Sequence, residues 1–235
     1  MKKKIGISFT RTNFQNYWNW FGPQDLGDDL ELVLLSFEKP DTSLIRDCDA
    51  FVLTGGVDMD PRFYDGDKVY PNQPDEYQPD RDRFEIEVYR EAKSKKAPVL
   101  AICRGMQLVH TEEGGKLIQD LGERNAKHKK DTDIDKQHEV QVQPDTRLAQ
   151  WTGLTAGKVN SAHHQALDPG TLSPVWTISA LDDQGLIEAI EWKDTETMPF
   201  LVGVQWHPER IINKEQNPLS QAIKEQFLQS IRQIQ

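Results

Sequence analysis

The segment Pro98–Gly105, with the sequence PVLAICRG, constrains the fold of this chain more than any other stretch. Its apolar run predicts a buried parallel strand, and the residues from Met106 onward predict a helix. Cys103 stands at the tight turn between them, where its thiol is lifted above the sheet edge. The helix N-terminus adds positive potential there, which favours a thiolate over a thiol. A lone cysteine after a strand is more commonly a structural core residue. Whether Cys103 is a nucleophile therefore depends on features elsewhere in the chain.

Length and charge limit the class of protein. The chain has 235 residues, enough for a substantial core, and we expect a single α/β domain over residues 1–235. A net charge of −10 argues against a nucleic-acid or membrane-surface binder. Two cysteines, Cys48 and Cys103, argue against a disulfide framework. The apolar runs are too short for a signal peptide or a membrane span, so we expect the protein in the cytoplasm.

Hydrophobic patterning predicts strands that alternate with helices, followed by a run of strands. This order favours a three-layer αβα fold, with a largely parallel central sheet covered by helices and antiparallel additions late in the chain. The mixed charges of residues 123–136 predict a solvated loop. Strands are expected over residues 4–9, 30–37, 49–54, 116–121, 138–142, 176–181, 187–192 and 201–205, and helices over 13–21, 41–48, 80–96 and 218–235.

Two further features complement Cys103. The apolar segment 202–206 ends at His207, and Glu209 follows two residues later. A histidine just past one parallel strand can reach a cysteine just past its neighbour, and a carboxylate can hold the other imidazole nitrogen. The Gly55–Gly56 turn and the Arg104 amide can supply backbone N–H groups to a developing oxyanion. Each feature is weak alone, but together they predict a cysteine nucleophile.

With these residues the chain resembles the class I glutamine amidotransferase-like domains, which have a flavodoxin-like fold. Within them it is similar to the γ-glutamyl hydrolase (peptidase C26) branch, the group of γ-glutamyl-γ-aminobutyrate hydrolase. The resemblance runs from about the first strand to Glu209. It is carried by the segments 54–64 (TGGVDMDPRFY), 80–82 (DRD), 101–108 (AICRGMQL), 160–165 (NSAHHQ) and 203–209 (GVQWHPE).

The resemblance implies a role for each matching residue. Cys103 is the expected nucleophile, His207 the general base and acid, and Glu209 the residue that orients the histidine. The expected substrate is a small γ-glutamyl amide, hydrolysed through a thioester, with no metal or organic cofactor. The implied oxyanion-hole amides belong to Gly56 and Arg104, and the implied substrate contacts are Gln107, Ser161 and His163.

Some positions depart from the family pattern. Ala101 stands where the family often has glycine, and residues 110–115 (HTEEGG) replace the usual continuation of the helix. The aromatic segment Asn13–Phe21 replaces the usual helix and Gly-Gly turn, and it can line a different substrate pocket. His128 and His138 are expected to be structural or exposed, since the histidine spacing makes no recognisable zinc set.

Two other functions remain open from the sequence. A glutaminase subunit that passes ammonia to a synthase partner would use the same chemistry. A catalytically silent binding or regulatory protein that kept this fold is the other alternative, and the intact set of Cys103, His207 and Glu209 argues against it. The family resemblance also makes a homodimer an expectation, whereas the leaving amine is not specified by any residue pattern.

Overall fold

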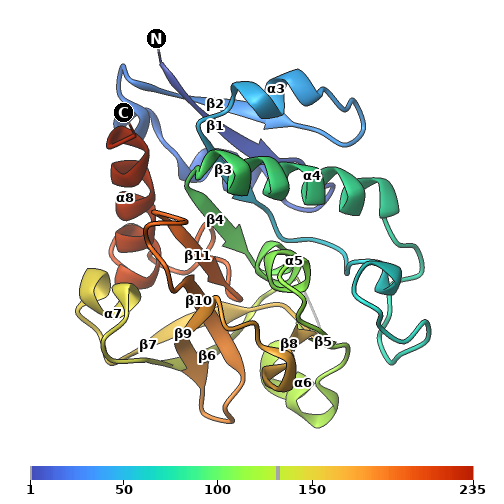
Figure 1. The fold of residues 1–235 in the computed structure, drawn as a ribbon. Helices are drawn as coiled ribbons and strands as arrows, with labels where there is room; N and C mark the ends of the chain where they lie inside the picture. Colours follow the sequence, from blue (N-terminus) through green and yellow to red (C-terminus); the bar gives the residue numbers. More distant parts are fainter. Residues whose placement is uncertain (1, 131–132, 235) are drawn as a thin grey trace.

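The computed structural model describes residues 2–130 and 133–234 (Figure 1). Within these residues the main sheet has nine strands in the order β2-β1-β3-β4-β11-β10-β9-β6-β7, and β5 and β8 form a separate pair. The strands are β1 (Lys3–Ser8), β2 (Leu30–Leu35), β3 (Ala50–Leu53), β4 (Val99–Ile102), β5 (Leu117–Ile118), β6 (Lys136–Val142), β7 (Ala156–Ser161), β8 (Ala166–Leu167), β9 (Trp176–Asp182), β10 (Ile187–Trp192) and β11 (Leu201–Val204).

The sheet has a parallel and an antiparallel half. Strands β2, β1, β3, β4 and β11 run parallel to one another, whereas β11 with β10, and β10, β9, β6 and β7 in that order, pair antiparallel. The predicted α/β architecture, a parallel sheet with antiparallel strands added late in the chain, is confirmed, and the antiparallel part makes up half of the pairings. Because β3 and β11 flank β4 in the same direction, the residues after these three strands emerge at one edge of the sheet.

Helices cover both faces of the sheet, which gives three layers (Figure 1). Helices α3, α4 and α5 share one core cluster with the strands, and α1, α7 and α8 share the other. No helix among the described residues is both long and apolar enough to cross a bilayer. The helices are α1 (Phe14–Trp20), α2 (Pro23–Leu26), α3 (Thr42–Asp47), α4 (Pro79–Lys95), α5 (Arg104–Glu112), α6 (Asn125–His128), α7 (Arg147–Thr152) and α8 (Pro218–Arg232), with 3₁₀ turns at Pro61–Phe63, Gly122–Arg124 and Pro169–Thr171.

Strand β4 shows why an apolar run becomes a central strand. Leu100 and Ile102 lie in one core cluster, whereas Val99 and Ala101 lie in the other. Alternate side chains of a strand point to opposite faces, so a strand with helices on both sides is apolar at every position.

The structure differs from the sequence prediction in the second half of the chain. Helix α7 and strands β7 and β8 were not predicted. For β7 the reason is that its six residues, AGKVNS, lack an alternating apolar pattern. Residues 123–136 contain a 3₁₀ turn and α6 rather than only a loop, although positions 131 and 132 lie outside the described residues. The final helix ends at Arg232, and position 235 also lies outside them.

The close approach of α5 to β3 yields a test of the packing. A Cβ added at Gly105 would lie 2.3 Å from the backbone oxygen of Leu53, which cannot rotate away. We expect Gly105→Ala to destabilise the fold by about 1–3 kcal/mol, as overpacking does. Denaturant unfolding measures the effect. Gly170→Ala is the control, because its nearest neighbour is the side chain of Asp168 at 3.2 Å; equal stability losses in the two variants would contradict the steric argument.

Candidate active site

Cys103 occupies a strained turn between β4 and α5. Its backbone has φ 52° and ψ −108°, a conformation that side-chain-bearing residues rarely adopt. Its N–H donates to Val204 O at 2.7 Å, which ties the turn to the end of β11. The tight approach of Gly105 to Leu53 lets the helix begin at once. The side chain of Cys103 is therefore presented at the sheet edge, as the sequence predicts for this elbow.

His207 reaches the same edge from the neighbouring strand. Ile102 and Val204 are paired in the parallel register of β4 and β11, so the residues after each strand lie side by side. The imidazole Nδ1 of His207 lies 2.9 Å from Glu209 Oε1, and its backbone N–H donates to Asn160 Oδ1 at 3.1 Å. A carboxylate acceptor fixes the proton on Nδ1, which leaves Nε2 for the chemistry.

The charge state of His207 follows from its neighbours. Burial alone would lower its pKa, but the carboxylate of Glu209 and the thiolate of Cys103 raise it to about 9, above the ordinary value of 6.5. The imidazolium is thus stabilised near neutral pH.

Two residues that the sequence analysis did not single out touch this pair. The hydroxyl of Tyr17 accepts from Gly55 N–H at 3.0 Å and lies 3.3 Å from His207 Nδ1. Gln205 donates from Nε2 to Cys103 Sγ at 3.4 Å. The aromatic segment Asn13–Phe21 was the only sequence signal for Tyr17, and Gln205 lay within a quoted motif without a role.

The glycine turn after β3 closes the third side of the site. A Cβ at Gly55 would lie 2.8 Å from both Tyr17 Oη and His207 Cε1, so the pocket has no room for a side chain there. Gly56 has φ 145°, and a Cβ on it would lie 2.2 Å from Arg81 Nη1. Arg104 is the first residue of α5, and the first N–H groups of a helix lack intrahelical partners. Gly56 lines the same cavity as the Cys103 thiol, and α5 begins directly after that cysteine.

Buried charges hold the turn against the elbow. Arg81 donates to Gly55 O at 2.8 Å and pairs with Glu85 at 3.1 Å, and all these side chains are almost inaccessible. Arg104 in turn pairs with Glu85 and Asp82. Asp82 also accepts from the backbone N–H of Asp60 at 3.0 Å, so Arg81 and Asp82 together tie the glycine turn and the loop after it to α4 and α5.

A cavity of about 230 Å³ opens over the thiol. Of the predicted site residues, it is lined by Cys103, His207 and Gly56. Its wall also includes Thr12, Asn13, Tyr17, Val57, Ala162, Lys130 and Arg210.

The predicted substrate contacts lie behind that wall. Gln107 donates from Nε2 to Gln205 Oε1 at 3.2 Å, and Gln205 in turn contacts the sulfur of Cys103. Ser161 and His163 flank the wall residue Ala162, but their side chains turn to His128: Ser161 Oγ lies 3.3 Å from His128 Nδ1, and the His163 and His128 ring centroids are 4.9 Å apart. Their roles toward substrate stay predictions.

Comparison with known proteins places this chain in a family. The fold is that of the class I glutamine amidotransferases: the chain superimposes on a glutamine amidotransferase from Thermotoga maritima with a TM-score of 0.63, at 13% identity over 99% of this chain and 97% of the other. For the glutaminase domain of CTPS from Trypanosoma brucei, determined with bound acivicin, the TM-score is 0.67 at 12% identity, over 100% and 95%.

The sequence assigns the family more closely. The peptidase C26 family model matches residues 31–209, and the chain belongs to this family. It is 37% identical to protein NtpR of Enterococcus hirae, over 86% of this chain and 83% of that protein. It is 31% identical to the γ-glutamyl-γ-aminobutyrate hydrolase PuuD of Escherichia coli, over 64% and 60%. Family membership supports a hydrolase or amidotransferase activity.

The buried charges predict the cost of breaking them. Glu85→Gln removes one carboxylate from between two guanidinium groups, so we expect a loss of about 3–5 kcal/mol in the free energy of unfolding. Chemical denaturation measures it, with Glu87→Gln on the exposed side of α4 as the control. A loss no larger than that of the control would show that Glu85 does not hold the turn.

The raised pKa of His207 predicts a titration. Removing the carboxylate in Glu209→Gln should lower the pKa of His207 from about 9, as followed by NMR of the ring nitrogens. Because the folded-state pKa lies above the unfolded value, the stability from the protonated ring is complete below pH 6.5 and is lost as the pH rises through about 9. The stability difference between wild type and Glu209→Gln should shrink over that range. Glu225→Gln is the control, because Glu225 is exposed and its replacement should leave the pKa of His207 unchanged. An unchanged pKa of His207 in Glu209→Gln would contradict the prediction.

Proposed function

We propose that this protein is a cysteine-dependent hydrolase of γ-glutamyl amide bonds. The observation that carries the proposal is the convergence of Cys103 and the His207–Glu209 pair on one cavity, from adjacent parallel strands. The cysteine adopts the strained backbone of a nucleophile elbow, and the histidine has a carboxylate partner. This is the constellation expected of acyl transfer through a thioester.

The steps follow from the position of each group. The Cys103 thiolate attacks the γ-carbonyl carbon of the substrate, and the Gly56 and Arg104 amides are our candidates to bind the resulting oxyanion. The protonated His207 gives its proton to the leaving nitrogen, the C–N bond breaks, and the free amine departs from the thioester. His207 then takes a proton from water, and the resulting hydroxide attacks the thioester, breaks the C–S bond and regenerates the thiolate. The product leaves as the γ-carboxylic acid, which loses its proton to solvent. Glu209 holds the imidazole throughout.

The cavity wall supports an anionic substrate. Lys130 and Arg210 line it together with the catalytic candidates, and a γ-glutamyl group carries an α-carboxylate that such cations can bind. Arg210 is oriented by Asp135, at 3.1 Å from Nε to the carboxylate. Gln107, Ser161 and His163 remain our candidates for contacts near the γ-glutamyl group, although none of the three lines the cavity itself.

A panel of γ-glutamyl amides separates the candidate functions. We expect the isolated protein to hydrolyse γ-glutamyl amines without a partner, with the preferred leaving amine identified from the panel. A glutaminase subunit would instead be almost idle on glutamine until its synthase is added. A silent binding protein would hydrolyse none of the panel and would fail to react at Cys103 with a thiol-reactive glutamine analogue.

Replacement of the nucleophile is the decisive test of mechanism. We expect Cys103→Ala to lower kcat/KM by about 10³-fold or more, since no other group can form the thioester. Cys48→Ala is the matched control: Cys48 is buried away from the cavity, and burial raises the pKa of its thiol to about 12, which keeps it unreactive. Mass spectrometry of trapped enzyme should locate the acyl group on Cys103. Full activity in Cys103→Ala would refute the mechanism.

A further inference from the structure

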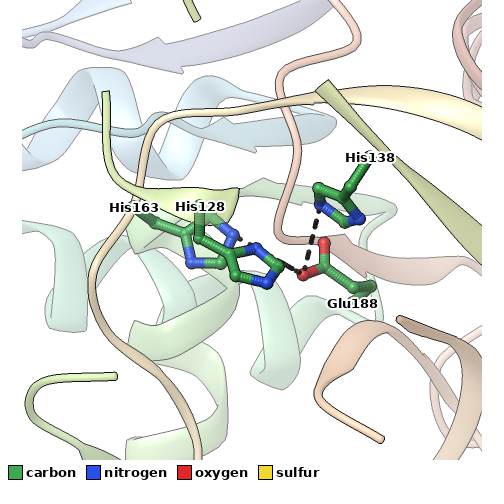
Figure 2. A group of neighbouring side chains, drawn as sticks. All are labelled: His128, His138, His163 and Glu188. Carbon is green, nitrogen blue, oxygen red and sulfur yellow. Dashed lines mark ion pairs between the residues drawn. The ribbon is translucent and has the colours of Figure 1, made fainter. Parts of the chain in front are cut away.

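Three histidines and a glutamate meet in the interior of the protein (Figure 2). None of the four lines the cavity over Cys103. His128 ends α6, His138 lies on β6, His163 follows β7, and Glu188 lies on β10. All four are buried, with exposures of 0%, 8%, 5% and 0%. One ligand atom from each lies within 4.8 Å of all the others. The proposed hydrolysis uses none of these four side chains as a reacting group.

The outer nitrogens of two rings determine which inner atoms carry lone pairs. His138 Nδ1 lies 3.1 Å from Glu139 O, and His163 Nδ1 lies 2.9 Å from Gln165 O. A carbonyl oxygen only accepts, so each Nδ1 must hold the proton. In a neutral ring the inner Nε2 then has a free lone pair, and it points into the cluster.

In His128 the two ring nitrogens exchange roles, so that Nε2 faces outward and Nδ1 faces the cluster. Its Nε2 lies 3.2 Å from the Asp182 carboxylate, so that nitrogen is the donor and Nδ1 faces Glu188. Ser161 Oγ also lies 3.3 Å from Nδ1, but its single proton is shared with His128 O at 3.1 Å. Carboxylates and carbonyls behind metal-binding histidines orient rings in this way.

Among the residues that the structure describes, none donates a hydrogen bond to the centre of the cluster. His138 Nε2, His163 Nε2 and both oxygens of Glu188 are buried and have no hydrogen-bond partner within residues 2–130 and 133–234. Imidazole lone pairs facing a buried carboxylate repel it, and an uncompensated buried charge is costly. The arrangement therefore calls for a cation among these atoms.

Distances distinguish a metal ion from a shared proton. Glu188 Oε1 lies 3.7 Å from His128 Nδ1, 3.6 Å from His138 Nε2 and 3.5 Å from His163 Nε2. A charge-assisted N–H···O bond would bring one pair to about 2.8 Å. Tetrahedral zinc with bonds of about 2.0–2.1 Å separates its ligand atoms by about 3.3 Å, close to all three spacings.

We propose that His128, His138, His163 and Glu188 bind one divalent transition-metal ion, with Zn²⁺ the best match to four borderline nitrogen and oxygen ligands. The protein fills all four positions in a buried site, which is typical of structural rather than catalytic zinc. The ion joins α6, β6, β10 and the segment after β7. That segment includes Ala162, which lines the cavity, so metal binding braces one wall of the site.

Metal analysis of the full chain is the first test. We expect about one equivalent of zinc by mass spectrometry after dialysis against chelator-free buffer. Removal by a strong chelator should lower Tm by about 5 °C or more, and added Zn²⁺ should restore it. Absence of bound metal, together with no Tm shift on adding Zn²⁺ to the chelator-treated protein, would overturn the proposal.

Cobalt substitution and variants test the ligands. Co²⁺ added to the metal-free protein should give the visible absorption of a four-coordinate ion, without a thiolate charge-transfer band. His138→Gln and Glu188→Gln should lose the metal, and Asp182→Asn should weaken binding by about 10–100-fold. His164→Gln, beside His163 but outside the cluster, is the control that keeps it. If both ligand variants kept the bound metal, the assignment of the ligands would be contradicted. If these variants do not fold, the absorption spectrum of the cobalt-loaded wild type is the deciding measurement.

The metal content, the Tm shift and the cobalt spectrum do not depend on the proposed hydrolase activity. Cys103→Ala should keep its zinc, since the thiol is not a ligand. Loss of zinc from that variant would contradict the assigned ligand set, whereas loss of its activity alone bears only on the proposed reaction.

Discussion

Parallel pairing of β3, β4 and β11 is the constraint on which the rest of the site depends. Because the three strands end at one edge, the glycine turn, Cys103 and His207 are brought together by register alone. Neighbouring parallel strands lie only about 4.8 Å apart, so side chains just past their ends are within reach of one another. Local details then adjust the geometry: a strained cysteine backbone, a carboxylate behind the imidazole, and a tyrosine hydroxyl against the turn.

The site is stiff because its supports are buried and charged. Arg81 and Arg104 reach from α4 and α5 to shared carboxylates, and Arg81 also binds the carbonyl of Gly55. Such ion pairs add little net stability over apolar packing, but they fix direction, because each guanidinium group donates in a defined plane. The turn therefore has a fixed orientation relative to the nucleophile.

The sequence predicted what local signals encode. An apolar run, a small turn and a helix start define the elbow at Cys103, and an apolar strand followed by His207 and Glu209 defines its counterpart. Strand β7 escaped notice because its polar residues are stabilised by pairing with β6 rather than by an alternating pattern. Tyr17 was visible only as one aromatic residue among several, since its hydroxyl contacts come from distant segments.

The histidine cluster escaped notice for a related reason. Its members stand on four separate elements between residues 128 and 188, so no short spacing links them and they form no local zinc motif in the sequence. Antiparallel pairing of β6 with β9, and of β9 with β10, brings these segments together. Such a group becomes recognisable only when side-chain directions are known.

The position of β11 has a consequence for how the protein is made. This strand comes last of all the sheet strands in the sequence, yet it is inserted between β4 and β10 and pairs with both. During synthesis the two halves of the sheet emerge from the ribosome before the strand that joins them. A growing chain therefore exposes two unpaired strand edges, and these edges are the surfaces at which chaperones or aggregation would act first.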